Sequence, residues 1–99
     1  MFGFFRITEV LAFADSVVAE YDRLVRSTVL RDDSPQKRQQ RFEKLAQHVD
    51  AYSREHKLNF YKKSKMLYAI KQGLETKGIA EAEITAFLNN LLAKSLSKT

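Results

Sequence analysis

Apolar residues recur along this chain at the alternating three- and four-residue steps that place them on one face of an α-helix. In the first third of the chain the apolar stripe is wide, so we expect this helix to be buried along much of its length. Thr8 is the expected N-cap, with Glu9 in the first turn, where a negative charge complements the helix dipole. The pattern predicts a helix over about residues 8–30, which the tetrapeptide 32–35 ends.

A second helix is predicted over about residues 34–57. Ser34 is a good cap and Pro35 suits the first helical position, where its missing N–H costs nothing. Asp33 with Gln36 is an alternative capping pair. The inner face of this helix is expected to consist of Phe42, Leu45, Val49, Tyr52 and His56.

A third helix is predicted over about residues 59–74 with Asn59 as its cap, although the pattern also allows one continuous rod with the second helix. Gly73 and Gly78 bracket its end, and one of them is expected to supply the left-handed residue that closes it. The inner face of the third helix is assigned to Phe60, Ser64, Leu67, Ile70 or Lys71, and Leu74. A fourth helix over about residues 80–96 has a broad apolar face that consists of Ile84, Phe87, Leu88, Leu91, Leu92 and Leu96.

Composition favours the same fold class. The chain has three glycines and one proline, too few turn residues for a β-sandwich or barrel, and strong helix formers dominate. Its 99 residues are a usual size for one domain. We therefore predict a single all-α domain over residues 1–99, either a compact four-helix bundle or an irregular four-helix array.

Two further features of the composition concern the cellular compartment. There is no cysteine, which excludes disulfides, thiolate zinc sites and cysteine nucleophiles and fits a reducing compartment. The chain shows neither a secretory signal nor an apolar run of about 20 residues that could span a membrane. We expect a cytoplasmic protein.

The net charge of +5 is unevenly distributed. Residues 1–33 carry four basic and six acidic side chains, residues 34–77 carry eleven and four, and residues 78–99 carry two of each. The excess positive charge therefore lies in the middle of the chain, where it can attract nucleic acid, anionic lipid or an acidic protein. Basic residues at the start of the second helix oppose the helix dipole, so they are not placed for helix stability.

Candidates for chemistry are few. His48 and His56 lie about 12 Å apart along a helix, which is too far for both to bind one zinc ion. The carboxylates of residues 32–33, Glu81 and Glu83 fall near helix starts, where the helix dipole accounts for them. The sequence contains no nucleophile elbow and no glycine-rich phosphate loop. We expect no catalytic residue, metal site, cofactor or small-molecule substrate.

The N-terminal segment, residues 1–7, is more apolar than a solvated tail would be. It can fold back onto its own bundle, pack into a second copy, or contact a membrane surface, and its short length and single cation disfavour the membrane. An isologous homodimer is the commonest way to bury surplus apolar surface. We therefore expect a small non-enzymatic helical protein that acts through protein–protein contact, first with itself. The expected interface consists of Phe2, Phe4, Phe5, Val10, Leu11 and Val18.

The alternative is a non-specific nucleic-acid-binding module that uses the basic middle of the chain. Lysines there interleave with tyrosines, a mixture typical of surfaces that contact both phosphates and bases, but equally explained as a solvated helix face. A helix-turn-helix is disfavoured because the exposed face of the fourth helix is acidic to neutral. This alternative surface consists of Arg38, Arg41, Lys57, Tyr61, Lys62, Lys63, Lys65 and Tyr68.

Overall fold

The computed structural model describes residues 7–31 and 34–96, and the regular elements in this part of the chain are all α-helices. Their order is α1 (Ile7–Arg31), α2 (Pro35–Glu55), α3 (Phe60–Thr76) and α4 (Glu81–Leu96). The predicted all-α class with four helices is confirmed, and the predicted boundaries agree with the structure to within about two residues.

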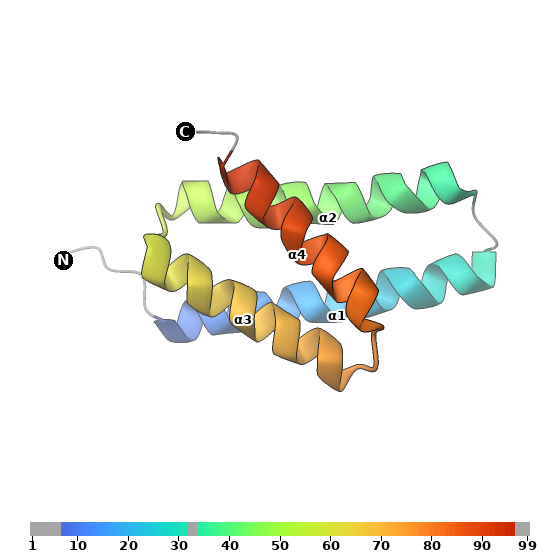
Figure 1. Cartoon of the computed structure of the whole chain (residues 1–99), viewed down its shortest axis with the longest axis horizontal. Coiled ribbons are helices and arrows are strands. Elements are labelled where there is room, and N and C mark those ends of the chain that lie inside the picture. Colours follow the sequence, from blue (N-terminus) through green and yellow to red (C-terminus); the bar gives the residue numbers. More distant parts are fainter. Residues whose placement is uncertain (1–6, 32–33, 97–99) are drawn as a thin grey trace.

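The helices form an irregular array (Figure 1). α1 and α2 form a long antiparallel hairpin, and α3 lies along α1 with its start at the same end of the molecule as the start of α1. α4 then crosses the array obliquely on its way back to α2. The most extensive helix contact is that between α1 and α3, and α2 contacts both α1 and α4.

The core lies where these four helices converge. Val10, Ile70 and Leu74 are completely buried, and the ring of Tyr21 packs edge-on against Phe87 with 5.0 Å between ring centroids. All 16 buried apolar side chains in the described residues form one cluster. They are Val10, Ala14, Val17, Val18, Tyr21, Leu24, Leu45, Ala46, Val49, Leu58, Met66, Ile70, Leu74, Ile84, Phe87 and Leu91.

The α1–α3 contact is close because Gly73 has no side chain. A Cβ atom at this position would lie 2.6 Å from Cγ2 of Val18, closer than real Cβ contacts allow. Gly73 is therefore an interior residue of α3 that lets the two helix backbones approach each other. The left-handed residue that closes α3 is Gly78, with φ of 82°.

The helix starts follow the predicted caps at two of the three sites. The Ser34 hydroxyl accepts from the amide of Lys37 with Pro35 next in the chain, and Asn59 Oδ1 accepts from the amide of Lys62 at 2.8 Å. The cap predicted at Thr8 is wrong, because α1 already includes Ile7.

A turn separates α2 from α3, so the continuous rod is excluded. α2 ends in a Schellman motif, in which the amide of Lys57 donates to the carbonyl of Arg54 and the amide of Leu58 to that of Ser53. Lys57 occupies the left-handed position with φ of 50°, where glycine is usual. Leu58 is buried behind it and anchors the turn to the core.

Four assignments to the inner faces are wrong. Phe60 is 85% exposed, Leu92 is 44% exposed, and His56 and Ser64 are exposed as well. Met66, which the pattern did not assign, is buried. The inner stripe of α3 runs through Met66, Ile70 and Leu74 at four-residue steps. Phe60 lies about 80° around the helix from Ile70, at the first helical position, and so falls beside the core instead of within it.

A polar contact holds α4 against α2. The carboxylate of Glu43 accepts from Asn90 Nδ2 at 3.0 Å and pairs with the ammonium of Lys94. The hydrogen bond from Lys94, and next that from Asn90, hold the pKa of Glu43 below its ordinary value. In the described part of the chain no helix combines the length and the hydrophobicity that crossing a bilayer requires.

Candidate functional site

An apolar groove opens between the second half of α2, the first half of α3 and the second half of α4. It has a volume of about 250 Å³. Its walls combine buried core residues with side chains that reach solvent, above all Phe60 and Leu92. The apolar groove is lined by Val49, Asp50, Ser53, Phe60, Lys63, Ser64, Met66, Leu67, Leu91 and Leu92.

The position of Phe60 follows from the turn before α3. The side chain of Asn59 caps α3, so Phe60 is the first helical residue. Leu58, two residues before it, is buried and holds the turn against the core. One ring is therefore held on a fixed backbone at the rim of an apolar hollow. An exposed phenylalanine on a rigid helix beside a matching hollow is typical of a protein–protein contact site.

The polar residues of the apolar groove lie at its rim. Asp50 pairs with Arg54 at 3.0 Å on α2, and the Ser53 hydroxyl donates to the carbonyl of Asp50 at 2.9 Å. Lys63 brings an opposite charge from α3. The groove thus carries one acidic and one basic side chain around an apolar centre, which is the distribution expected of an interface.

A second surface is the solvent face of α3, which contains Tyr61, Lys65 and Tyr68. Tyr61 and Tyr68 are 61% and 57% exposed. The ammonium of Lys65 lies 5.7 Å from the centre of the Tyr61 ring, and Gln72 Nε2 donates to the Tyr68 hydroxyl at 2.8 Å. Two exposed rings and one cation therefore share one helix face, as their spacing predicts.

The other members of the predicted basic surface lie elsewhere. Arg38 and Arg41 belong to the first half of α2, which rises about 25 Å between Arg38 and its last residue. Lys57 lies in the α2–α3 turn, outside any helix, and Lys62 and Lys63 are half-buried. The eight residues therefore do not form one face, and the two arginines do not extend the surface formed by α3.

The predicted self-association surface also needs correction. Val10 and Val18 are buried inside this same chain, where they pack in the core between α1 and its neighbours. Leu11 is the member of the set that reaches solvent in the described residues. Phe2, Phe4 and Phe5 lie outside the described residues.

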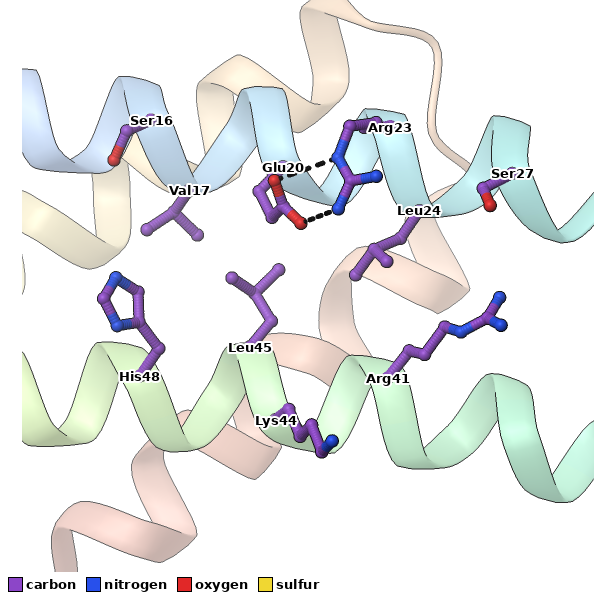
Figure 2. A pocket seen from close by; sticks show the side chains of 10 residues that line it. All are labelled: Ser16, Val17, Glu20, Arg23, Leu24, Ser27, Arg41, Lys44, Leu45 and His48. Atoms are coloured by element: carbon purple, nitrogen blue, oxygen red, sulfur yellow. Dashed lines mark hydrogen bonds and ion pairs between the residues drawn. The ribbon is translucent and has the colours of Figure 1, made fainter.

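A charged groove of about 590 Å³ runs between α1 and α2 (Figure 2). Val17, Leu24 and Leu45 point toward one another across its floor, and His48 and Arg41 rise from α2 on either side of Leu45. The charged groove is lined by Ser16, Val17, Glu20, Arg23, Leu24, Ser27, Arg41, Lys44, Leu45 and His48.

One ion pair dominates the α1 side of the charged groove. The guanidinium of Arg23 pairs with the carboxylate of Glu20 through two nitrogens, with 3.1 Å from Nε to Oε1. The hydrogen bond from Arg23 lowers the pKa of Glu20, and the smaller effect of burial opposes it. Arg23 and Glu20 therefore neutralise each other, whereas the α2 side of the charged groove is cationic.

The histidines take part in aromatic packing. Phe13 stacks on Tyr52 with centroids 3.6 Å apart and lies 5.4 Å from the ring of His48, while Tyr52 contacts His56 at 4.5 Å. Burial, followed by the charge of Glu9, raises the pKa of Tyr52. Among the residues described, no three histidine or acidic side chains gather closely enough to hold a metal ion.

Sequence reasoning missed the apolar groove because it placed Phe60 and Leu92 inside the core. The four-residue spacing of Met66, Ile70 and Leu74 was the available signal, since a stripe through those three leaves Phe60 at its edge.

Comparisons of the chain with protein-family models, with curated proteins and with solved structures found no match.

Proposed function

We propose that this chain is a small non-enzymatic helical protein that acts through protein–protein contact, and that its first partner is a second copy of itself. The observation that carries the proposal is the 85% exposure of Phe60 at the rim of the apolar groove. A two-fold symmetric dimer uses the same patch on both subunits, so the patch must be complementary to itself. A protruding ring beside an apolar hollow meets this requirement.

In the proposed dimer Phe60 of each copy enters the apolar groove of the other and packs on Met66, Leu67 and Leu91 there. Leu92 closes the contact at the rim, and the Asp50 side of one groove faces the Lys63 side of the other. The apolar groove thus replaces the interface predicted around Val10 and Val18, which the core already uses.

The contribution of Phe60 to the free energy of association sets the expected affinity of the dimer. Burying a phenylalanine side chain stabilises a complex by about 1.5–3 kcal/mol, and the symmetric contact counts twice. Association itself costs about 4–15 kcal/mol, so the two rings need the rim contacts of Leu92 and its neighbours to offset that cost. We therefore expect a weak dimer whose population depends on protein concentration in the micromolar range.

Sedimentation velocity over about 1–200 µM protein tests the proposal, because this range covers a micromolar dissociation constant. Phe60→Asp removes both rings at once and is expected to weaken the dimer by about 100-fold or more, with helix content by circular dichroism unchanged. Tyr68→Asp is the matched control, since it adds the same charge in place of another exposed aromatic residue of α3 and should leave the dimer intact.

Two results would contradict this function. One is a wild-type chain that remains monomeric at the highest concentration. The other is self-association that survives Phe60→Asp or responds equally to the control. Leu92→Asp changes a different wall of the apolar groove and provides a second variant if Phe60→Asp disturbs folding.

A second candidate function is nucleic-acid binding by the solvent face of α3. The specific observation in its favour is the pair of exposed rings, Tyr61 and Tyr68, on either side of Lys65. Stacking of a base on an aromatic ring contributes about 1–3 kcal/mol, and phosphate contacts make affinity fall steeply with salt. Fluorescence anisotropy with a single-stranded oligonucleotide should show loss of binding in Tyr61→Ala and at high salt; binding indifferent to salt would exclude this function.

The predicted cytoplasmic location is part of the proposal. The chain has no cysteine, which fits a reducing compartment. Fractionation of cells that produce the tagged protein tests it, and recovery with the membrane fraction would contradict it.

A further inference from the structure

A further groove, which we call the aromatic groove, opens between α4 and the α1–α2 hairpin. Tyr21 and Val25 of α1, Arg38 and Phe42 of α2, and Glu83 of α4 are among the residues that line it. Its volume of about 500 Å³ falls within the range of about 300–1,000 Å³ that small-molecule sites occupy. None of its lining residues belongs to the apolar groove or to the charged groove.

The hydroxyl of Tyr21 has no hydrogen-bond partner in the residues that the structure describes. Tyr21 is 5% exposed, and its ring packs against those of Phe42 and Phe87, with centroids 4.8 and 5.0 Å away. A buried tyrosine hydroxyl usually finds a partner. This hydroxyl is not sealed off from solvent either, so it opens into the aromatic groove that Tyr21 lines. The groove therefore contains a hydroxyl that is held in place by aromatic packing and is available to a bound molecule.

Two opposite charges face the aromatic groove from different helices. Arg38 lies on α2 and Glu83 on α4, and both side chains are exposed. Within residues 7–31 and 34–96, neither side chain has an ion-pair or hydrogen-bond partner, so they do not pair with each other. Burial, and after it the charge of Glu83, raises the pKa of Tyr21 to about 12. Glu83 therefore lies near the Tyr21 hydroxyl, which keeps its proton at neutral pH.

The aromatic groove also presents apolar surface that solvent reaches. Val25 and Phe42 are half-buried and Ala86 is exposed, so a ligand can contact these side chains while the core stays closed. A ligand with a single charge would be attracted by one of the two charged walls and repelled by the other. Opposite charges on two walls are complementary to a zwitterion, and the accessible apolar side chains favour one that has an apolar group.

We propose that the aromatic groove binds a free amino acid with an apolar side chain. The carboxylate of the ligand pairs with the Arg38 guanidinium and accepts a hydrogen bond from the Tyr21 hydroxyl. Its ammonium pairs with Glu83, and its side chain packs on Val25 and Phe42. Water screens the exposed charges, so we expect a dissociation constant of about 1 mM. This ligand goes beyond the proposed self-association and does not depend on it.

A nitrogen-15 NMR titration of the full chain with L-leucine tests the proposal. N-acetyl-L-leucine lacks the ammonium, L-leucinamide lacks the carboxylate and glycine lacks the apolar side chain, so each provides a separate arm. L-leucine should shift the amide signals of Val25, Arg38, Phe42 and Ala86 in a saturable way, and each other probe should bind at least about fivefold more weakly. Absence of saturable shifts at these positions, or equal binding of any one of the three analogues, would overturn the proposal.

Tyr21→Phe tests the hydroxyl, because it keeps the ring and removes only the oxygen. It is expected to weaken L-leucine binding by about tenfold, since a hydrogen bond to a charged group is lost. Tyr68→Phe is the matched control, because it removes the hydroxyl of a tyrosine that does not line the groove, and it should leave binding within about twofold of the wild type. Unchanged binding in Tyr21→Phe would overturn the proposed role of this hydroxyl.

Charge variants on the surface keep the proposal testable if Tyr21→Phe disturbs the core. Arg38→Gln and Glu83→Gln are each expected to weaken L-leucine binding by about fivefold. Lys37→Gln makes the same change in charge as Arg38→Gln on a neighbouring side chain that does not line the groove, and should leave binding within about twofold of the wild type. Equal losses in Arg38→Gln and Lys37→Gln would show that no defined site exists.

Discussion

Alanine in place of Gly73 would put a methyl group into the contact between α1 and α3. Its Cβ would lie 2.6 Å from Cγ2, 3.1 Å from Cγ1 and 3.3 Å from Cβ of Val18. Val18 is 5% exposed and β-branched, and such a side chain has one strongly preferred rotamer in a helix, so it cannot turn away. The substitution therefore forces the two helices apart or distorts one of them.

Two effects of opposite sign decide the outcome of Gly73→Ala. Alanine is favoured over glycine inside a helix by about 1 kcal/mol, whereas overpacking a core costs about 1–3 kcal/mol. A separation of 2.6 Å belongs at the severe end of overpacking, so we expect a net loss of about 1–2 kcal/mol. For a domain of this size such a loss lowers the melting temperature by about 5–15 °C.

Urea denaturation of a double-mutant cycle with Val18→Ala isolates the contact. Val18→Ala removes the two nearest carbon atoms and alone costs about 2 kcal/mol through lost burial and a cavity. In that background Gly73→Ala should be neutral or stabilising by up to about 1 kcal/mol, because only the helix preference remains. The two changes are therefore expected to be strongly non-additive.

Gly78→Ala is the control, because its Cβ would meet no atom within 4 Å while φ is positive. It should cost about 1 kcal/mol through backbone strain alone, in the wild type and in Val18→Ala alike. The reasoning about helix approach is refuted if Gly73→Ala stabilises the otherwise unchanged chain by about 1 kcal/mol, or if its effect is independent of Val18.

Three further predictions concern single groups. Burial raises the pKa of Tyr21 to about 12 from 10, so the neutral phenol stabilises the fold fully below pH 10 and this stabilisation is lost as pH rises toward 12. The free energy of unfolding should therefore fall by about 3 kcal/mol over this pH range because of Tyr21. Urea titrations at successive pH values should show that Tyr21→Phe lacks this fall. The lowered pKa of Glu43 stabilises the fold above pH 4.5 and ceases to do so as pH falls through the folded-state pKa. Glu43→Gln should therefore cost up to about 1 kcal/mol at pH 7 and nothing in strong acid, where a persistent difference would contradict the ion pair. Lys57→Gly relieves the left-handed strain and should raise the free energy of unfolding by about 1 kcal/mol, measured by urea denaturation; no gain would contradict the positive φ.

Periodicity and capping residues were enough to predict the helices. Ser34 and Asn59 have short polar side chains that satisfy free amides, and this local chemistry operates in the same way in any fold. The end of α2 was less predictable, because Lys57 takes a backbone conformation that usually signals glycine. Only the burial of Leu58 beside it, a tertiary effect, explains why the chain turns there.

The candidate surfaces were harder to predict. A stripe on a helix shows which face is buried but not which other helix covers it, so the approach of Val18 to Gly73 has no signature at either position. The apolar groove combines residues from α2, α3 and α4 that are up to 43 positions apart in the chain. The clustering of Tyr61, Lys65 and Tyr68 was predictable, because it depends on the geometry of a single helix.

The pairing of α1 with α3 means that the α1–α2 hairpin and the α3–α4 hairpin depend on each other. The main partner of α1 begins only after the turn at residues 56–59, so a cut in that turn would leave each half with an apolar face that only the other half can cover. Neither hairpin would be a stable unit alone, yet the two together contain every contact of the core. The protein is thus a natural candidate for fragment complementation, in which two separately made halves regain the fold when they meet.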